Sequence, residues 1–252
     1  MSRLLRASAG LIFAFLYLPL LALMVFSVNA SSSTVWEGFS LRWYTELLAD
    51  EQILVATANS ILIASVSTLA SAAVGTLCAY GLWKRRSRWL ITSLYLSLVT
   101  PEIVMGVALL AFYQAIFRFL DIHLGMHTVI LAHVSFCLSY VVLVVLARLR
   151  TMDATLEEAA MDLGATEWQA FYRVTLPALA PAIAAAALLA FTTSFDDYVI
   201  TSLVAGVDSE TLPMVIYAKA RRAISPSVNA LCAIIVVGIG TLVLLSQRLQ
   251  KS

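Results

Sequence analysis

Residues 128–147 read TVILAHVSFCLSYVVLVVLA, twenty residues without a lysine, arginine, aspartate or glutamate. A helix needs about 20 apolar residues to cross the ~30 Å hydrocarbon core of a bilayer. A helix also satisfies its own backbone hydrogen bonds, as any chain crossing lipid must. This stretch therefore predicts a membrane-spanning α-helix.

The rest of the chain has the same character, because 61% of its 252 residues are hydrophobic and only 12% are charged. Soluble proteins carry about 25% charged residues, so most of this surface is expected to face lipid. A barrel would show short alternating strands instead of long apolar runs. The sequence predicts an all-α polytopic membrane protein, without a separate soluble domain. Its six transmembrane helices are expected at residues 7–28, 53–82, 89–117, 128–147, 178–204 and 229–245.

Two of these runs carry an irregularity. The run 178–204 is interrupted by Asp196-Asp197, and the run 229–245 is short. The first run resembles a signal peptide, but its 22 residues exceed a signal core of ~7–15 residues, so an uncleaved helix is expected. The three cysteines are odd in number and widely spaced, which excludes a disulfide framework and a CxxC metal site.

The basic residues indicate the orientation of the chain. With the N-terminus inside, eleven of the sixteen basic residues fall in inner segments. The positive-inside rule then predicts that both termini and the loop 149–176 are cytoplasmic. The inner residues are Arg3, Arg6, Lys84, Arg85, Arg86, Arg88, Arg148, Arg150, Arg173, Arg248 and Lys251, and the outer ones are Arg42, Arg118, Lys219, Arg221 and Arg222.

The loop after the fourth run contains the sequence TLEEAAMDLGATEWQ at residues 155–169. It predicts two short helices, each starting with a capping box, Thr155 with Glu158 and Thr166 with Gln169. Gly164 is placed to end the first helix in a left-handed conformation. An amphipathic helix pair of this kind is suited to docking against a partner.

The spacing of this loop resembles the EAA loop of ABC-importer permeases. The match runs from the EAA triplet through Gly164 to the LP pair that ends the loop, with Val174 in place of the commoner isoleucine. In that family the loop inserts into a groove of the cytoplasmic ATPase, which implies a coupling loop at about 149–177. The coupling residues implied are Glu158, Ala159, Ala160, Gly164, Glu167, Leu176 and Pro177.

Further segments resemble the spermidine/putrescine permeases, in particular PotC-type subunits, over nearly the whole chain. They include 36–40 (WEGFS), 101–105 (PEIVM) and 191–197 (FTTSFDD). Glu102 stands where an aspartate is expected, which leaves the polyamine open. The resemblance implies a type I ABC-importer permease fold, with one permease domain over 1–252 and no cofactor of its own. It also implies that the chain lies in the bacterial inner membrane. The partners implied are a second permease subunit in a heterodimer, two copies of a cytoplasmic ATP-binding subunit, a periplasmic polyamine-binding protein and the lipid bilayer.

Acidic residues inside membrane runs are costly and indicate function. Glu102 follows Pro101 inside the third run, and Asp196 and Asp197 interrupt the fifth. We expect these three acids, with Ser194 nearby, to line a substrate pathway in which a polyamine offsets their charge. The alternatives are that the two aspartates form a solvated helix end, and that Glu102 pairs with a basic residue.

Aromatic and histidine residues admit several interpretations. Trp43 is expected either to belong to an interfacial aromatic belt or to contact a substrate ammonium through its ring. His123 and His127 lack further ligands, so no metal site is expected. His133 is expected to hydrogen-bond between helices.

The sequence contains no nucleophile–base pair, no Gly-rich phosphate loop and no signal for nucleic acid binding. The chain is therefore expected to be no enzyme, with ATP hydrolysis left to a partner. The main hypothesis is a permease subunit of an ATP-driven polyamine importer. The alternatives are a permease for another small cation, such as thiamine or a quaternary amine, and a membrane channel or enzyme.

Overall fold

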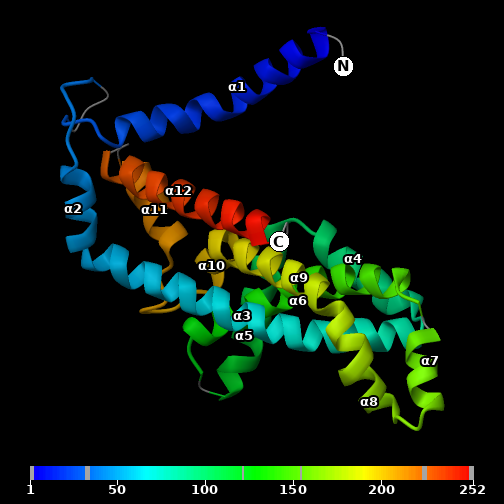
Figure 1. Cartoon of the computed structure of the whole chain (residues 1–252). Helices are drawn as coiled ribbons and strands as arrows, with labels where there is room; N and C mark the ends of the chain where they lie inside the picture. The colour runs from blue at the N-terminus through cyan, green and yellow to red at the C-terminus, as the bar shows by residue number, and fades with distance from the viewer. Residues whose placement is uncertain (1–2, 32–34, 121, 154, 223–225, 250–252) are drawn as a thin grey trace. The chain divides into compact units, whose positions relative to one another are not determined.

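A computed structural model describes residues 3–31, 35–120, 122–153, 155–222 and 226–249, which are almost entirely helical. The α-helical fold class predicted from the sequence is confirmed. The helices are α1 (Arg3–Phe26), α2 (Arg42–Ala49), α3 (Glu51–Lys84), α4 (Arg88–Val99), α5 (Glu102–Leu120), α6 (Met126–Thr151), α7 (Thr155–Asp162), α8 (Glu167–Ala170), the π-helix η1 (Phe171–Thr175), α9 (Leu176–Asp196), α10 (Val199–Val204), α11 (Leu212–Arg222) and α12 (Pro226–Leu249) (Figure 1).

Four helices of the described chain are long and apolar enough to cross a membrane, at Leu5–Phe26, Glu51–Lys84, Met126–Thr151 and Glu167–Asp196. A fifth crossing exists if the pair Arg88–Val99 and Glu102–Phe117 counts as one broken span. The sixth predicted run falls in the 24-residue helix α12, of which the described apolar part, Pro226–Gly238, is by itself shorter than a span. The structure is thus consistent with the predicted six crossings and establishes four or five.

The third predicted run is not the single helix that its length suggested. Helices α4 and α5 meet at an angle of 110°. Thr100 is extended there, with φ −64° and ψ 128°, and Pro101 follows it. Proline lacks a backbone N–H and disfavours helical geometry in the residue before it. Pro101 therefore breaks the helix that was expected to run through residues 89–117.

The chain divides into two compact units, and the first contains Met1–Val55 and Val215–Ser252. In this unit α12 packs against α1 and α2. The carboxylate of Asp50 lies 2.7 Å from the ammonium of Lys219, which ties the start of α3 to α11. That ammonium holds the pKa of Asp50 below its usual value.

The second unit, Ala56–Met214, is built around α6, which packs against α4, α5, α9 and α10. Helix α6 is apolar on all sides, and more than half of its span is buried inside the protein, so it forms the core of this unit. Its side chains with no exposed surface include Val129, Ala132, Val141, Val142 and Val145. Small residues of α9, such as Ala186 and Ala190, are fully buried and allow close approach to α6.

Candidate functional site

A cavity of about 280 Å³ in the second unit brings Glu102, Asp196 and Asp197 together. Two chain breaks create it: Glu102 is the first residue of α5, and Asp196 is the last residue of α9. Glu102 and Asp196 are exposed, whereas the Asp197 side chain is only 6% exposed. The predicted gathering of the three acids thus has a geometric basis. The remaining wall includes Ser97, Thr100, Phe136, Tyr140, Thr193 and Tyr198.

Asp197 differs from the other two acids because its carboxylate is engaged inside the protein. Its oxygens accept hydrogen bonds from the backbone N–H groups of Ile200, at 3.4 Å, and Thr201, at 2.8 Å. The Thr201 hydroxyl donates to it at 2.7 Å. These contacts satisfy N–H groups at the start of α10 that have no partner within the helix. Asp197 therefore shapes the turn between α9 and α10.

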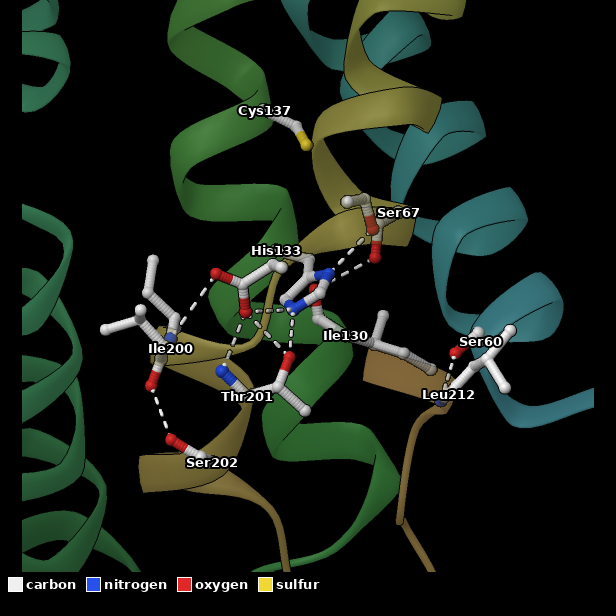
Figure 2. A network of polar contacts seen from close by, with 12 residues as sticks. Ser60, Ser67, Ile130, His133, Cys137, Ile200, Thr201, Ser202 and Leu212 are labelled. Carbon is white, nitrogen blue, oxygen red and sulfur yellow. Dashed lines mark hydrogen bonds and ion pairs between the residues drawn. The ribbon is translucent and has the colours of Figure 1, made fainter. Parts of the chain in front are cut away.

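His133 of α6 joins this turn to the core, and Figure 2 shows its ring directed toward Thr201. Its Nε2 lies 2.9 Å from Thr201 Oγ1 and 3.4 Å from Asp197 Oδ2. Its Nδ1 lies 2.6 Å from the hydroxyl of Ser194 on α9. The prediction that His133 bonds between helices is confirmed. Ser194 was expected on the pathway, but it is buried and its hydroxyl is bonded to His133.

Trp43 lies in the first unit, where it is buried in α2. Its indole N–H donates to the carbonyl of Asn29 at 2.6 Å. The guanidinium of Arg42 stands 4.2 Å from the ring centroid, so a cation of the chain itself already contacts the ring.

The predicted coupling loop consists of α7, α8 and η1, which lead into α9 (Figure 1). Gly164 has φ +91°, which confirms the expected left-handed turn after α7. The capping box of Thr166 and Gln169 is also confirmed, with bonds of 3.0 and 3.3 Å. The capping box expected at Thr155 is wrong, because Thr155 lies inside α7 and its hydroxyl donates to Asp153.

The second short helix is not a separate element as expected. Helix α8 continues through the π-helix η1 into α9, and Pro177 lies in the first turn of α9. Proline inside a continuous helix removes one backbone hydrogen bond, and the wider π-helical turn η1 lies just before it. The loop after Gly164 is therefore built as a continuous extension of a membrane helix.

The residues implied for coupling lie mainly at the surface of this loop. Glu158, Ala159, Gly164, Glu167 and Pro177 are exposed, whereas Ala160 and Leu176 are half-buried. Apolar side chains around them are exposed as well, namely Leu156, Leu163, Trp168 and Tyr172. Such a patch is typical of a surface that another protein covers.

Sequence reasoning missed Glu157, which is the buried acid of α7 and is only 3% exposed. Its carboxylate lies 2.9 Å from the ammonium of Lys84 and accepts hydrogen bonds from Tyr80 at 2.5 Å and Thr175 at 3.1 Å. Burial would raise the pKa of Glu157, but these hydrogen bonds and the Lys84 charge outweigh burial and lower it. We name this cluster the Glu157 anchor; it joins α7 to the end of α3 and to η1.

No local signal distinguished Glu157 from Glu158. The two acids are adjacent in sequence, but one points into the protein and the other to its surface. One clue was available: Lys84 ends a long apolar run beside Trp83, where a charge gains from a partner.

In the part of the chain that the structure describes, no group of three or more His, Cys, Asp or Glu is placed to hold a metal ion.

The family model for the inner membrane component of binding-protein-dependent transport systems matches residues 71–252. The chain belongs to this family. The matched segment includes the acidic cavity and the whole predicted coupling loop of this permease.

Individual relatives agree with the family. The permease is 42% identical over 235 residues to the putrescine transport system permease protein PotI of Escherichia coli K12, covering 90% of this chain and 84% of PotI. It is 36% identical over 244 residues to the spermidine/putrescine permease protein PotC of the same organism, covering 95% of this chain and 91% of PotC. The resemblance to polyamine permeases read from the sequence is confirmed.

A solved structure supports the fold. A bacterial ABC transporter involved in the import of the acidic polysaccharide alginate matches with a TM-score of 0.72 and 17% identity, covering 100% of this chain and 98% of that one. At this identity the similarity concerns the fold alone. The predicted ABC-importer permease fold is confirmed, and the chain is a multi-pass inner-membrane protein.

Proposed function

We propose that this permease forms the membrane pathway for a polyamine, and that putrescine fits it best. The single observation that carries this proposal is the cavity shared by Glu102 and Asp196, two exposed acids at the ends of broken helices. The similarity to PotI, at 42%, and to PotC, at 36%, supports the same class of substrate.

The number of available carboxylates favours a dication. The Asp197 carboxylate already accepts hydrogen bonds from Thr201 at the start of α10. Glu102 and Asp196 are therefore the acids available to bind a substrate. Two unit charges at an effective dielectric near 20 attract each other by roughly 4 kcal/mol at 4 Å. Two carboxylates thus match the two ammonium groups of a diamine, with Tyr140 and Phe136 in the same wall for its apolar chain.

The position of the cavity suits a transport pathway. Helix α9 contains 21 residues and separates the coupling loop from Asp196. At 1.5 Å per residue this is about 30 Å, the thickness of the hydrocarbon core. We place the coupling loop and both termini in the cytoplasm, and the acids toward the periplasmic side.

ATP hydrolysis is assigned to other subunits. The exposed residues Glu158, Ala159, Gly164 and Glu167 would meet an ATP-binding subunit, and the Glu157 anchor would pass its movement to α3 and α9. One permease domain over residues 1–252 would pair with a second permease subunit in a heterodimer, with two copies of the ATP-binding subunit. A periplasmic polyamine-binding protein would deliver the substrate.

The test is uptake by the assembled transporter in proteoliposomes. Labelled putrescine, spermidine and thiamine are compared, with ATP inside and the binding protein outside. We expect ATP-dependent putrescine uptake that falls at least tenfold in Glu102→Gln and Asp196→Asn at unchanged assembly. Thiamine uptake without polyamine uptake would overturn the substrate, and ATP-independent flux would favour the channel alternative.

A further inference from the structure

A second cavity, of about 620 Å³, lies where α3 and α6 end and α4 begins, on the side of the predicted coupling loop. Arg86 and Arg88 reach it from the turn between α3 and α4, and Arg150 from the last turn of α6. Its other wall is apolar and consists of Leu82, Trp83 and Ile91. Neither transport nor coupling, as derived above, uses this cavity.

The charge of this cavity is uncompensated within the described protein. Its described lining holds three guanidinium groups and no carboxylate. Within the described ranges, no ion pair joins Arg86, Arg88 or Arg150 to an acid. The nearby Lys84 differs, because its ammonium is paired with Glu157 at 2.9 Å. Three guanidinium groups without an acidic partner in one cavity favour binding of an anion. Each planar guanidinium can donate two parallel hydrogen bonds to phosphate oxygens.

The apolar half of the cavity identifies the source of that phosphate. Helices α3 and α6 are spans, and the arginines stand at the ends of these spans, where lipid headgroups lie. Trp89 is 87% exposed at the start of α4, and Leu90 beside it is exposed too. Tryptophan at a span end is typical of the lipid–water interface. A soluble anion would not need an apolar wall, whereas a phospholipid places its phosphate beside its acyl chains.

We infer that this cavity binds the headgroup of an anionic phospholipid, with the phosphate held by Arg86, Arg88 and Arg150 and the glycerol and upper acyl chains against Trp83 and Ile91. Basic pockets between transmembrane helices are known sites for anionic headgroups. The lipid would brace the turn between α3 and α4, from which Lys84 reaches the Glu157 anchor.

The chain offers a matched pair of variants for the test. Arg86→Gln/Arg150→Gln removes two charges from the cavity, and Arg85→Gln/Arg148→Gln removes two charges from the same helix ends outside its lining. The assembled transporter, stripped of native lipid, is placed in phosphatidylcholine nanodiscs with a minor fraction of phosphatidylglycerol. Native mass spectrometry then counts the phosphatidylglycerol that stays bound.

We expect wild type and the Arg85/Arg148 variant to retain phosphatidylglycerol, and the Arg86/Arg150 variant to lose roughly 30-fold in affinity, about fivefold for each arginine. Equal loss in both variants, or retention in both, would overturn the site. Displacement of the lipid by millimolar inorganic phosphate would indicate a site for soluble anions instead. Loss of the ATP-binding subunit from the Arg86/Arg150 variant in pure phosphatidylcholine would indicate an acidic protein partner. Putrescine uptake is recorded separately, so failure of the lipid site does not bear on the transport proposal.

Discussion

The carboxylate of Glu157 on α7 lies 2.9 Å from the ammonium of Lys84 at the end of α3. The two side chains differ in exposure, since Glu157 is 4% and Lys84 is 36% exposed. The coupling loop is therefore held to a membrane helix by an ion pair that is buried on one side only. Because of this difference in exposure, loss of the Lys84 charge and loss of the Glu157 charge are expected to change the free energy of unfolding by different amounts.

Removal of Lys84 should destabilise the chain more than removal of the Glu157 charge. Lys84→Met leaves a buried carboxylate without its cation, whereas Glu157→Gln leaves a lysine that can turn to solvent. With the partial exposure of Lys84 taken into account, we expect losses of about 2 and about 1 kcal/mol respectively. Denaturant unfolding of the purified protein in detergent measures both, and Lys84→Met/Glu157→Gln should recover part of the loss. A larger loss for Glu157→Gln would contradict this assignment.

The stability supplied by the Glu157 anchor should depend on pH. The pKa of Glu157 is lowered from its usual 4.5 in the folded chain. Its contribution is therefore complete above pH 4.5 and is lost as the pH falls through the lower folded pKa. We expect the stability difference between wild type and Glu157→Gln to shrink as the pH falls below 4.5, measured by thermal unfolding at a series of pH values. A constant difference down to pH 3 would rule out this linkage.

Gly164→Asp should uncouple ATP hydrolysis from uptake. Gly164 has φ +91°, where an aspartate costs about 1 kcal/mol or more, although a Cβ there meets no atom within 4 Å. The new charge also lies at the negative end of α7. Gly164→Asn is the control, because asparagine has the shape of aspartate and adds no charge. We expect substrate-stimulated ATPase activity to fall strongly in the aspartate variant and mildly in the asparagine variant; normal stimulation in both would count against the coupling assignment.

Substitution of Asp196 should lower uptake, whereas substitution of the neighbouring Asp197 should lower stability and assembly. Asp197→Asn turns one of two acceptor oxygens into a donor, which then faces either the Ile200 N–H or the Thr201 N–H and hydroxyl. We expect a loss of about 1–2 kcal/mol in stability and less assembled complex. The neighbouring isosteric change Asp196→Asn should leave assembly normal and lower uptake. Uptake normalised to assembled complex measures both, and normal assembly in both variants would contradict the division.

The proposed orientation can be tested at two equally exposed apolar residues. Val207, just beyond α10, is 87% exposed, and Leu163, at the end of α7, is 91% exposed. In a variant with the three native cysteines replaced, Val207→Cys should react with an impermeant maleimide in intact spheroplasts. Leu163→Cys should react only after permeabilisation. The reverse pattern would invert the topology, and with it the assignment of the coupling loop to the cytoplasm.

Much of the fold followed from signals that act within a few residues. The length of the apolar run predicts the spans in α1, α3 and α6, Gly164 predicts a left-handed turn, and Asp196-Asp197 predicts an interruption of the fifth run; the structure agrees with each of these. Each depends on the chemistry of a short segment: lipid thickness, the missing Cβ of glycine, or the cost of a charge in lipid. The angle at Pro101 could not be predicted, because it depends on how α5 packs against α10.

The sequence by itself determined the class of protein, the approximate spans, the family and the acids that line the cavity. Only the tertiary structure decided what each acid does: that Glu157 and not Glu158 holds the coupling loop, and that Asp197 serves the start of α10. The physical reason is that these roles depend on partners from distant parts of the chain, such as Lys84 and Tyr80 for Glu157 and His133 for Asp197. Adjacent acids have the same local chemistry, so only packing tells them apart.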